Sequence, residues 1–481
     1  MRHQSPVPQK TPTALGIVGR LSGRVAAVLL ATCLATLLGQ RAHAQSDGAA
    51  NQSIWQQDTL TGDWGGERTA LKTQGIDVTL NDISEILGDV SGGINRGSVY
   101  EGRFEFTLDA DLQKLLGWTG ATAHTTIYQI NNIGGRIDPD FVGSISDPSN
   151  IDALPTARLF TAWLQQTFLD DKISLRIGQL AVDDEFLTSK TAGGLIDGTF
   201  GWPDLMAANL PGGGPAYPLA TPGVRVAVKP SDALTIRAAA FSGNPAGAGC
   251  NGDPQACDLY GTKFSFSGGV FSIAELQYDI NQGKSSQGLP GTYKVGAWYH
   301  SADFADEHYG LNAGGLPVSL ASPAVVAPLA HMGNWGLYGV VDQTTWRAAS
   351  GPGSISAFLR AGAAPSDRNL VSFYVDGGLG VTAPLPHRDN DILTIGASWS
   401  NVSSDAAALD VDTQGVLGAW YPVRDYELVL EASYQIQVAP WWVIQPDVQY
   451  IVHPGGNVID PAFLAPIPNA FVLGARTTVS F

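Results

Sequence analysis

Alternation of polar and apolar residues constrains the fold of this chain most, and its last eleven residues, FVLGARTTVSF, show it clearly. The mostly apolar side of this segment carries Phe471, Leu473, Ala475, Thr477, Val479 and Phe481. The opposite side carries Val472, Gly474, Arg476, Thr478 and Ser480. A strand of this length crosses a bilayer when it is tilted, and a terminal aromatic ring suits the membrane interface. The pattern predicts the closing strand of a membrane β-barrel; an ordinary half-buried C-terminal strand is the alternative.

The same period of two recurs along the chain from Ile76 onward. Between Tyr100 and Leu112, apolar residues such as Phe104 and Leu108 alternate with Arg103, Glu105 and Asp109. About seventeen stretches read this way, near 76, 100–112, 119–130, 158–168, 173–178, 224–229, 233–242, 261–267, 270–279, 291–300, 335–347, 354–361, 370–376, 391–400, 427–436, 441–451 and 471–481. A single-chain bacterial barrel has an even number of strands, so sixteen are expected.

Stretches rich in Gly, Pro, Asn and Asp separate these strands and predict the long loops. They cover 131–156, 181–221, 243–260, 302–334 and 453–469. The five prolines of 201–222 block regular strand pairing, and we expect this segment to fold inward and narrow the lumen. One barrel over 76–481 then accounts for the chain after residue 75.

The first 44 residues have the design of a secretory signal. Basic residues precede an apolar run, Val25 to Leu38, and Ala42-His43-Ala44 predicts cleavage after Ala44. The run is short of the roughly 20 residues that a membrane anchor needs. A lipoprotein signal at Cys33 is the weaker alternative. Residues 45–75 are predicted to be periplasmic, with a short helix over Gly62 to Gln74 that Gly75 ends.

Charge and composition favour a barrel and exclude a nucleic-acid partner. Residues 1–44 hold five basic and no acidic residues, so the mature chain has 22 basic against 44 acidic side chains, a net charge of −22. The whole chain is 44% hydrophobic and only 15% charged, yet no later apolar run approaches 18 residues. Strands that hide their apolar residues by alternation explain both facts.

Two cysteines, Cys250 and Cys257, remain after cleavage, in the turn-like segment CNGDPQAC. An oxidising compartment favours a disulfide that closes this loop, with two free thiols as the alternative. A metal site is not expected, because the histidines are scattered without ligand spacing and no histidine or further cysteine lies near this pair.

Polar residues on the lumen faces are the candidates for solute contact. Arginine, carboxylate and amide side chains give the directional hydrogen bonds that sugar hydroxyls need, and aromatic faces suit their C–H side. The candidates are Arg103, Glu105, Asp109, Arg176, Arg225, Gln445, Asp447, Gln449 and Arg476. Pairing with one another, or holding water, is the alternative role for each.

Catalysis finds little support in the sequence. No G-x-S-x-G motif, phosphate loop or cofactor motif occurs. The run Asp183-Asp184-Glu185 has the residue type of a glycosidase, but lumen-lining roles explain it better.

Several segments of the mature chain resemble the carbohydrate-selective porins of Gram-negative outer membranes, the OprB-type family. They are DWGGERTALKTQGI (63–76), GRFEFTLDADLQKLLGW (102–118), RIGQLAVDDEF (176–186), FGWPDLMAANLPGGGPAYPLATPGVRV (200–226), PWWVIQPDVQYIVHPGG (440–456) and NAFVLGARTTVSF (469–481). Residues 243–330 show no such match. The resemblance implies a sixteen-stranded barrel, a periplasmic N-terminal helix and diffusion of glucose-like sugars into the periplasm.

We therefore expect an outer-membrane porin for small sugars, without cofactor or enzymatic activity. The alternatives are a barrel for other small solutes, such as anions or aromatic acids, and a secreted all-β enzyme acting on polysaccharide. Phe481 is expected to be the C-terminal mark that the barrel-insertion machinery reads. Apolar outward faces suit contacts with outer-membrane lipids and contacts within a homotrimer equally, so the sequence leaves monomer and homotrimer both open.

Overall fold

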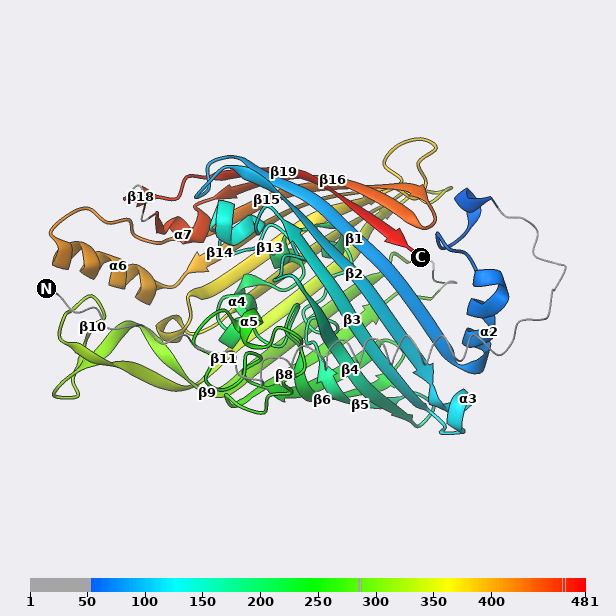
Figure 1. Cartoon of the computed structure of the whole chain (residues 1–481), viewed down its shortest axis with the longest axis horizontal. Helices are drawn as coiled ribbons and strands as arrows, with labels where there is room; N and C mark the ends of the chain where they lie inside the picture. The colour runs from blue at the N-terminus through cyan, green and yellow to red at the C-terminus, as the bar shows by residue number, and fades with distance from the viewer. Residues whose placement is uncertain (1–52, 284–285, 287, 461, 463) are drawn as a thin grey trace, which may run out of the picture. The chain divides into compact units, whose positions relative to one another are not determined.

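The computed structural model describes residues 53–481, apart from 284–285, 287, 461 and 463, so the predicted signal segment 1–44 lies outside the described residues. Sixteen long antiparallel strands close into one barrel (Figure 1), which confirms the expected fold and strand number. They are β1 (Ile76–Ser91), β2 (Gly97–Asp111), β3 (Ala121–Ile133), β4 (Thr156–Phe168), β5 (Ile173–Leu180), β6 (Thr221–Ser231), β7 (Leu234–Ser242), β8 (Val270–Ile280), β9 (Gly291–Asn312), β11 (Val325–Arg347), β12 (Ser354–Ala363), β13 (Val371–Thr382), β14 (Ile392–Val402), β15 (Tyr426–Ala439), β16 (Trp442–Val452) and β19 (Ala470–Ser480).

The C-terminal strand closes the barrel, as its alternation predicts. β19 pairs with β1 over a register that runs from Asn81↔Ser480 to Ser91↔Phe471, and with β16 on its other edge. Neighbouring strands pair around the whole ring, so no long strand keeps an open edge. Closure satisfies the backbone polar groups that a bilayer would leave unpaired.

Apolar residues of the strands face outward and polar residues face the interior. On the outer surface Val295, Leu337 and Ile395 are half exposed or more. On the inner surface Arg360 and Asp376 are buried by the loops that occupy the barrel. Apolar residues outside and polar residues inside are the reverse of the arrangement in a soluble protein. A barrel that contacts lipid on its outer surface and encloses a polar lumen requires this arrangement.

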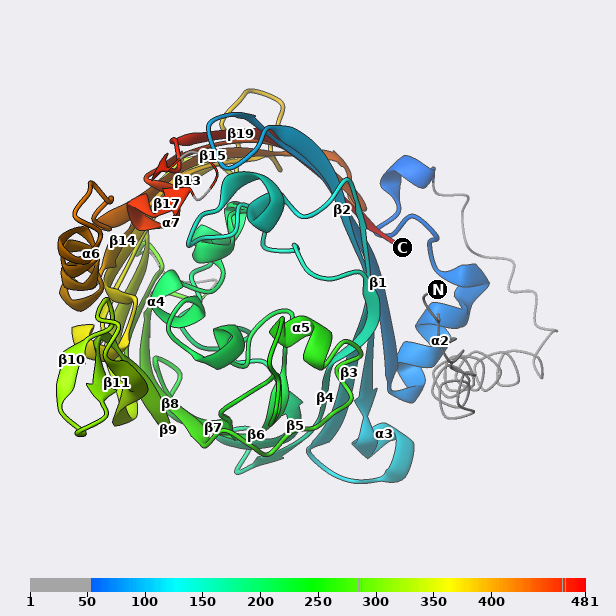
Figure 2. The same ribbon diagram turned by 60° about the vertical axis from the view of Figure 1, so that its left-hand side comes forward.

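The two ends of the barrel differ in their connections. One end carries short turns, for example 169–172, 232–233 and 348–353. The other end carries the long connections 134–155, 181–220, 243–269, 403–425 and 453–469. The first two of these, with 243–269, fold back into the barrel (Figure 2).

Short helices lie in the connections and at the N-terminal end. They are α2 (Glu67–Gln74), α3 (Leu112–Leu116), α4 (Asp204–Ala207), α5 (Pro254–Cys257), α6 (Ser404–Leu417), α7 (Pro454–Asn457), the π-helical turn η3 (Asp138–Val142), and the 3₁₀ turns η1 (Ile54–Gln56), η2 (Trp64–Gly66), η4 (Ala192–Gly194), η5 (Gly198–Phe200), η6 (Pro211–Gly213) and η7 (Ser366–Arg368). Within the described ranges, every helix is too short or too polar to cross a membrane. Three very short strands complete the fold: β10 (Pro317–Ser319), β17 (Ile459–Asp460) and β18 (Ala465–Pro466).

The N-terminal helix lies at the short-turn end, beside the C-terminus (Figure 1). Gly75 ends α2 in the left-handed conformation, at φ 104°, as the sequence predicts. Leu60 donates its N–H to the carbonyl of Ser480 at 2.8 Å, and the Trp441 indole donates to the carbonyl of Ile54 at 2.8 Å. Both bonds fix the segment before β1 to the last residues of the barrel wall.

Two expectations about individual elements are wrong, and one helix was not expected. The alternating stretch 261–267 is not a strand, because Phe264 lies in the left-handed region at a φ of 47°, which interrupts an extended chain. The stretch 302–334 is not a loop, because β9 continues to Asn312 and β11 begins at Val325, well beyond the length a bilayer needs. Helix α6 was missed, although Ser403 caps its first turn and Gly418 ends it.

Candidate functional site

Three long connections meet inside the barrel and divide its interior. Gly198 donates its N–H to the carbonyl of Asp147 at 2.7 Å, which joins the 181–220 loop to the 134–155 loop. Leu154 donates its N–H to the side-chain oxygen of Gln255 at 2.7 Å, which joins the 134–155 loop to the 243–269 loop. The disulfide between Cys250 and Cys257 closes the tip of this third loop, with 5.8 Å between their Cα atoms. The three loops therefore form one connected body within the lumen.

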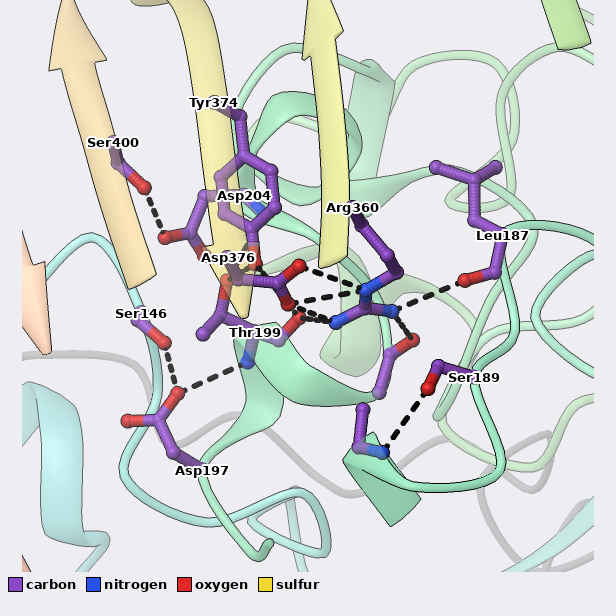
Figure 3. A network of polar contacts seen from close by, with 12 residues as sticks. Ser146, Leu187, Ser189, Asp197, Thr199, Asp204, Arg360, Tyr374, Asp376 and Ser400 are labelled. Carbon is purple, nitrogen blue, oxygen red and sulfur yellow. Dashed lines mark hydrogen bonds and ion pairs between the residues drawn. The ribbon is translucent and has the colours of Figure 1, made fainter. Parts of the chain in front are cut away.

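The 181–220 loop leaves β5 and is bound to the opposite wall (Figure 3). The Arg360 guanidinium on β12 donates to the carbonyls of Leu187 (3.1 Å) and Thr199 (3.0 Å), and more weakly to that of Gly201 (3.4 Å). It also forms a buried ion pair with Asp376 on β13. Both ends of the segment 187–201, the lobe of this loop, are thus held by one side chain.

Further bonds fix the lobe and the turn after it to β11, β13 and β14. Asp342 accepts from the Ser189 hydroxyl at 2.6 Å and from the Thr191 N–H at 2.9 Å. Asp204 accepts from the Ser400 hydroxyl at 2.6 Å. The expectation that 201–222 folds into the barrel is confirmed by these contacts and by the position of α4 in Figure 2.

A row of arginines lies on the part of the wall formed by β2, β5 and β6. The Arg225 guanidinium donates to both carboxylate oxygens of Glu185, at 2.6 and 3.0 Å. Arg176 lies 3.9 Å from the same carboxylate and donates to Gln165 at 3.1 Å. Arg103 lies 3.6 Å from Glu105. We call Arg103, Arg176 and Arg225 the arginine row, and each lies within 4 Å of a carboxylate. The side chains of Arg103 and Arg176 stay 15% and 16% exposed, whereas Arg225 is buried and its guanidinium nitrogens are engaged by protein groups.

Aromatic rings accompany the arginine row. The Arg103 guanidinium lies over the rings of Tyr128 and Tyr217, at 4.7 and 5.0 Å from their centroids. The Arg176 guanidinium on β5 lies 3.8 Å from the ring centroid of Trp163 on β4. His124, on β3 at the other side of β4, stacks on the same indole, with 4.5 Å between the ring centroids. The indole is therefore packed between Arg176 and His124, and Trp163 also contacts the hydrophobic cluster of the 181–220 loop.

Three consecutive carboxylates of the 181–220 loop face this row. Asp183 accepts from the Tyr217 N–H at 3.0 Å, and Glu185 pairs with the arginines. Asp184 is solvent-accessible, yet the partial desolvation by the surrounding chain and the adjacent Asp183 carboxylate raise the pKa of Asp184 to about 7. Cations on the wall and carboxylates on the loop produce a transverse field, which orients neutral dipolar solutes.

The predicted solute-contact residues fall into two groups. Arg103, Arg176 and Arg225 form the arginine row, with Glu105 beside Arg103. Asp109 lies near them, because its 2.7 Å contact is to His124, which stacks on Trp163.

The other predicted residues are Gln445, Asp447, Gln449 and Arg476, and they lie beneath the inward loops, at most 7% exposed. Gln445 donates to the carbonyl of Gly194 at 3.1 Å, and Gln449 to that of Pro148 at 2.9 Å. Arg476 pairs with Glu85 at 2.6 Å and donates to Asn150. In this structure Gln445, Gln449 and Arg476 hold loops, and Asp447 accepts from the Gln449 amide.

Sequence reasoning missed the aromatic partners and the loop anchors. Tyr128 and Trp163 occupy inward positions of stretches that were read as strands, so alternation could have found them. Tyr217, Arg360 and Asp376 gave no such signal, because their roles depend on how the 181–220 loop folds. In the part of the chain that the structure describes, no three His, Cys, Asp or Glu side chains gather closely enough to hold a metal ion.

A closed sixteen-stranded barrel with an apolar outer face and a charged lumen defines the class of outer-membrane porins. Residues 95–481 match the family described as "Carbohydrate-selective porin, OprB family", so the chain belongs to this family. It is a carbohydrate-selective porin of the Gram-negative outer membrane, and a channel rather than an enzyme.

Known relatives extend over most of the chain. Porin B of Pseudomonas aeruginosa is 25% identical over 453 residues, which cover 89% of this chain and 93% of the relative. The putative porin QuiX of Acinetobacter baylyi is 24% identical over 448 residues, 86% of this chain and 93% of its own. The high-pH structure of Pseudomonas putida OprB superposes with a TM-score of 0.76 at 22% identity and covers 89% of this chain and 100% of that one, which shows the same fold.

Proposed function

We propose that this porin lets glucose-like monosaccharides diffuse passively into the periplasm, and that they pass along the arginine row. The observation that carries this proposal is the wall of β2 to β6, where paired guanidiniums, carboxylates and aromatic rings stand together. Sugars are neutral and rich in hydroxyls, so they exchange hydrogen bonds with such groups without the cost of burying a net charge.

The orientation in the membrane follows from the two ends of the barrel. Outer-membrane barrels carry short turns on the periplasmic side and longer loops outside. We therefore place the short-turn end and helix α2 in the periplasm, and the end from which the three inward loops enter the barrel outside. A solute then meets the three inward loops first and leaves past the short turns.

Liposome swelling tests this function directly. Vesicles with the purified porin should swell faster in glucose than in a charged solute of similar size. Arg103→Ala and Glu105→Ala should each change the glucose rate while heat-modifiable gel mobility stays normal, because both remove one partner of the 3.6 Å pair. Lys172→Ala on the exposed β4–β5 turn is the matched control and should swell like the wild type.

Two results would contradict the proposal. Swelling in glucose no faster than in protein-free vesicles would remove sugar diffusion as the function. Normal glucose rates in both the Arg103 and the Glu105 variants would remove these residues from the path.

A further inference from the structure

A second polar hollow lies between the lobe of the 181–220 loop and the short-turn end. Its volume is about 550 Å³, within the range of roughly 300–1,000 Å³ of small-ligand sites. Lobe residues from Thr188 to Gly194 bound it on one side, and the short-turn ends of β8, β9 and β11 to β15 bound it elsewhere. The arginine row is not part of its lining. We call this space the exit hollow.

Hydroxyl and amide groups dominate the lining of the exit hollow. They belong to Thr188, Thr191, Thr292, Thr344, Ser354, Ser356, Thr382, Thr394, Gln277, Gln282 and Gln435. None of its described lining residues is aromatic. Such a surface suits a solute with many hydroxyl groups, because each lining group can donate or accept.

The charges in the lining are not balanced by one another. Among the residues that the structure describes, Lys190 and Arg347 have neither a hydrogen bond nor an ion pair of their side chains. Asp342, the carboxylate of the lining, already accepts from the Ser189 hydroxyl at 2.6 Å and twice from Thr191. The lining therefore holds two cations without an anionic partner, and both oxygens of its one carboxylate, Asp342, are occupied.

A third cation, Lys294, lines the hollow but is engaged. Its ammonium donates to the Thr188 hydroxyl at 2.7 Å and to the Thr188 carbonyl at 2.9 Å, and lies 3.7 Å from Glu275. It fixes the second residue of the lobe and adds to the positive field. This arrangement differs from the arginine row, where every guanidinium has a carboxylate within 4 Å.

From this difference we infer that the exit hollow is a second solute-binding site, for a small polyhydroxylated molecule that carries an anionic group, either carboxylate or phosphate. Lys190 and Arg347 bind the anionic group, and the hydroxyl-rich wall binds the rest. The inference rests on the proposed function only in that sugar-sized solutes enter the barrel. It assigns the exit hollow a preference for charged sugars that the balanced arginine row does not share.

Binding is measured from the concentration dependence with which a solute reduces single-channel current in a planar bilayer. The probes, added to both sides, are glucuronate, glucose 6-phosphate, neutral glucose and acetate. We expect glucuronate and glucose 6-phosphate to bind about fivefold or more tightly than glucose, and acetate to bind more weakly than glucuronate.

The variants Lys190→Gln and Arg347→Gln should each lower the glucuronate affinity, and the double variant should bring it within about twofold of that for glucose. Lys172→Gln removes an exposed cation at the same end of the barrel, outside the exit hollow, and should change nothing. Neither of the two hollow cations holds the lobe, so the affinity for glucose should persist.

Three outcomes would overturn the inference. The first is wild-type affinity for glucuronate no higher than for glucose, and the second is unchanged glucuronate affinity in the double variant. The third is acetate binding as tightly as glucuronate, which would leave a plain anion site. Because glucose swelling is measured independently, each of these outcomes can occur while the sugar-diffusion proposal stands. Conversely, absent glucose swelling together with normal glucuronate binding would contradict only the sugar-diffusion proposal.

Discussion

Replacement of Arg360 by methionine is expected to release the lobe of the 181–220 loop from the wall. The wild-type guanidinium is 2% exposed, pairs with Asp376 and holds the carbonyls of Leu187 and Thr199. Methionine is similar in length but leaves the Asp376 carboxylate buried without a cation. Loss of one partner of a buried ion pair costs about 3–5 kcal/mol.

Part of this cost belongs to the orphaned carboxylate and part to the lobe. The two shorter bonds to loop carbonyls are worth about 1 kcal/mol each, and the 3.4 Å contact to Gly201 adds little. A double variant, Arg360→Met with Asp376→Leu, removes the stranded charge and should cost only about 2 kcal/mol. The double variant is therefore expected to be more stable than the single one.

Urea unfolding in phospholipid vesicles measures the free energies, and single-channel recording measures the pore. Both variants should give higher and noisier conductance than the wild type, because both free the lobe from β12. A single variant as stable as the wild type would refute the reasoning about the ion pair. Unchanged conductance in both variants would show that the lobe does not need this anchor.

Three further predictions concern the same loops. Because the pKa of Asp184 is raised to about 7, its carboxylate is charged above that pH and neutral below it. Lowering the pH from 8 to 5 should therefore shift the reversal potential in a KCl gradient toward the value for an anion-selective channel. Asp184→Asn should reduce this shift, and an equal shift in the variant and the wild type would contradict the assignment. Deletion of 204–219, the stretch that contains α4, should raise single-channel conductance, and an unchanged value would show that this stretch does not narrow the path. Replacing Cys250 and Cys257 with serine should destabilise the local structure of 243–269 by about 2 kcal/mol, seen as faster amide exchange there with normal exchange in the strands.

Strand number and closure could be predicted from the sequence because alternation is a local signal. Each strand faces lipid on one side and polar groups on the other, so every segment carries the pattern by itself. The failures have local reasons as well. The stretch 261–267 alternates, but it follows a disulfide-closed turn, and Phe264 lies in the left-handed region. The extension of β9 and β11 beyond the membrane was not predicted, because the length of a membrane strand is expected to match the bilayer and these strands are longer than that.

The solute path was predictable only in part. Alternation identifies which residues point inward, and it correctly placed Arg103, Arg176 and Arg225 on the inner face. It does not tell which inward residues the loops will cover. Gln445 and Gln449 follow the same rule, yet the loops at 134–155 and 181–220 bury them.

The covered wall residues form hydrogen bonds with the backbone of the inward loops, which explains why the lumen carries so many charges. Irregular loops enclosed by a barrel bring backbone N–H and C=O groups that lack strand partners, and burial of unpaired groups is costly. The wall supplies the partners. Glu427 accepts from the N–H groups of Ile145 and Ser146, at 2.7 and 2.9 Å, and Glu431 from those of Ile196 and Asp197.

Wall cations and amides serve the loop carbonyls in the same way. Arg158, fully buried on β4, donates to the carbonyls of Pro218, Gln255 and Leu259, and Gln179 donates to that of Gly261. A charged inward residue is therefore as well explained by a loop it holds as by a solute it contacts. What separates the two roles is the area that the loops leave open. In this barrel the exit hollow is open, and Arg103 and Arg176 keep part of their side chains exposed, whereas Arg225 is covered as Arg158 is.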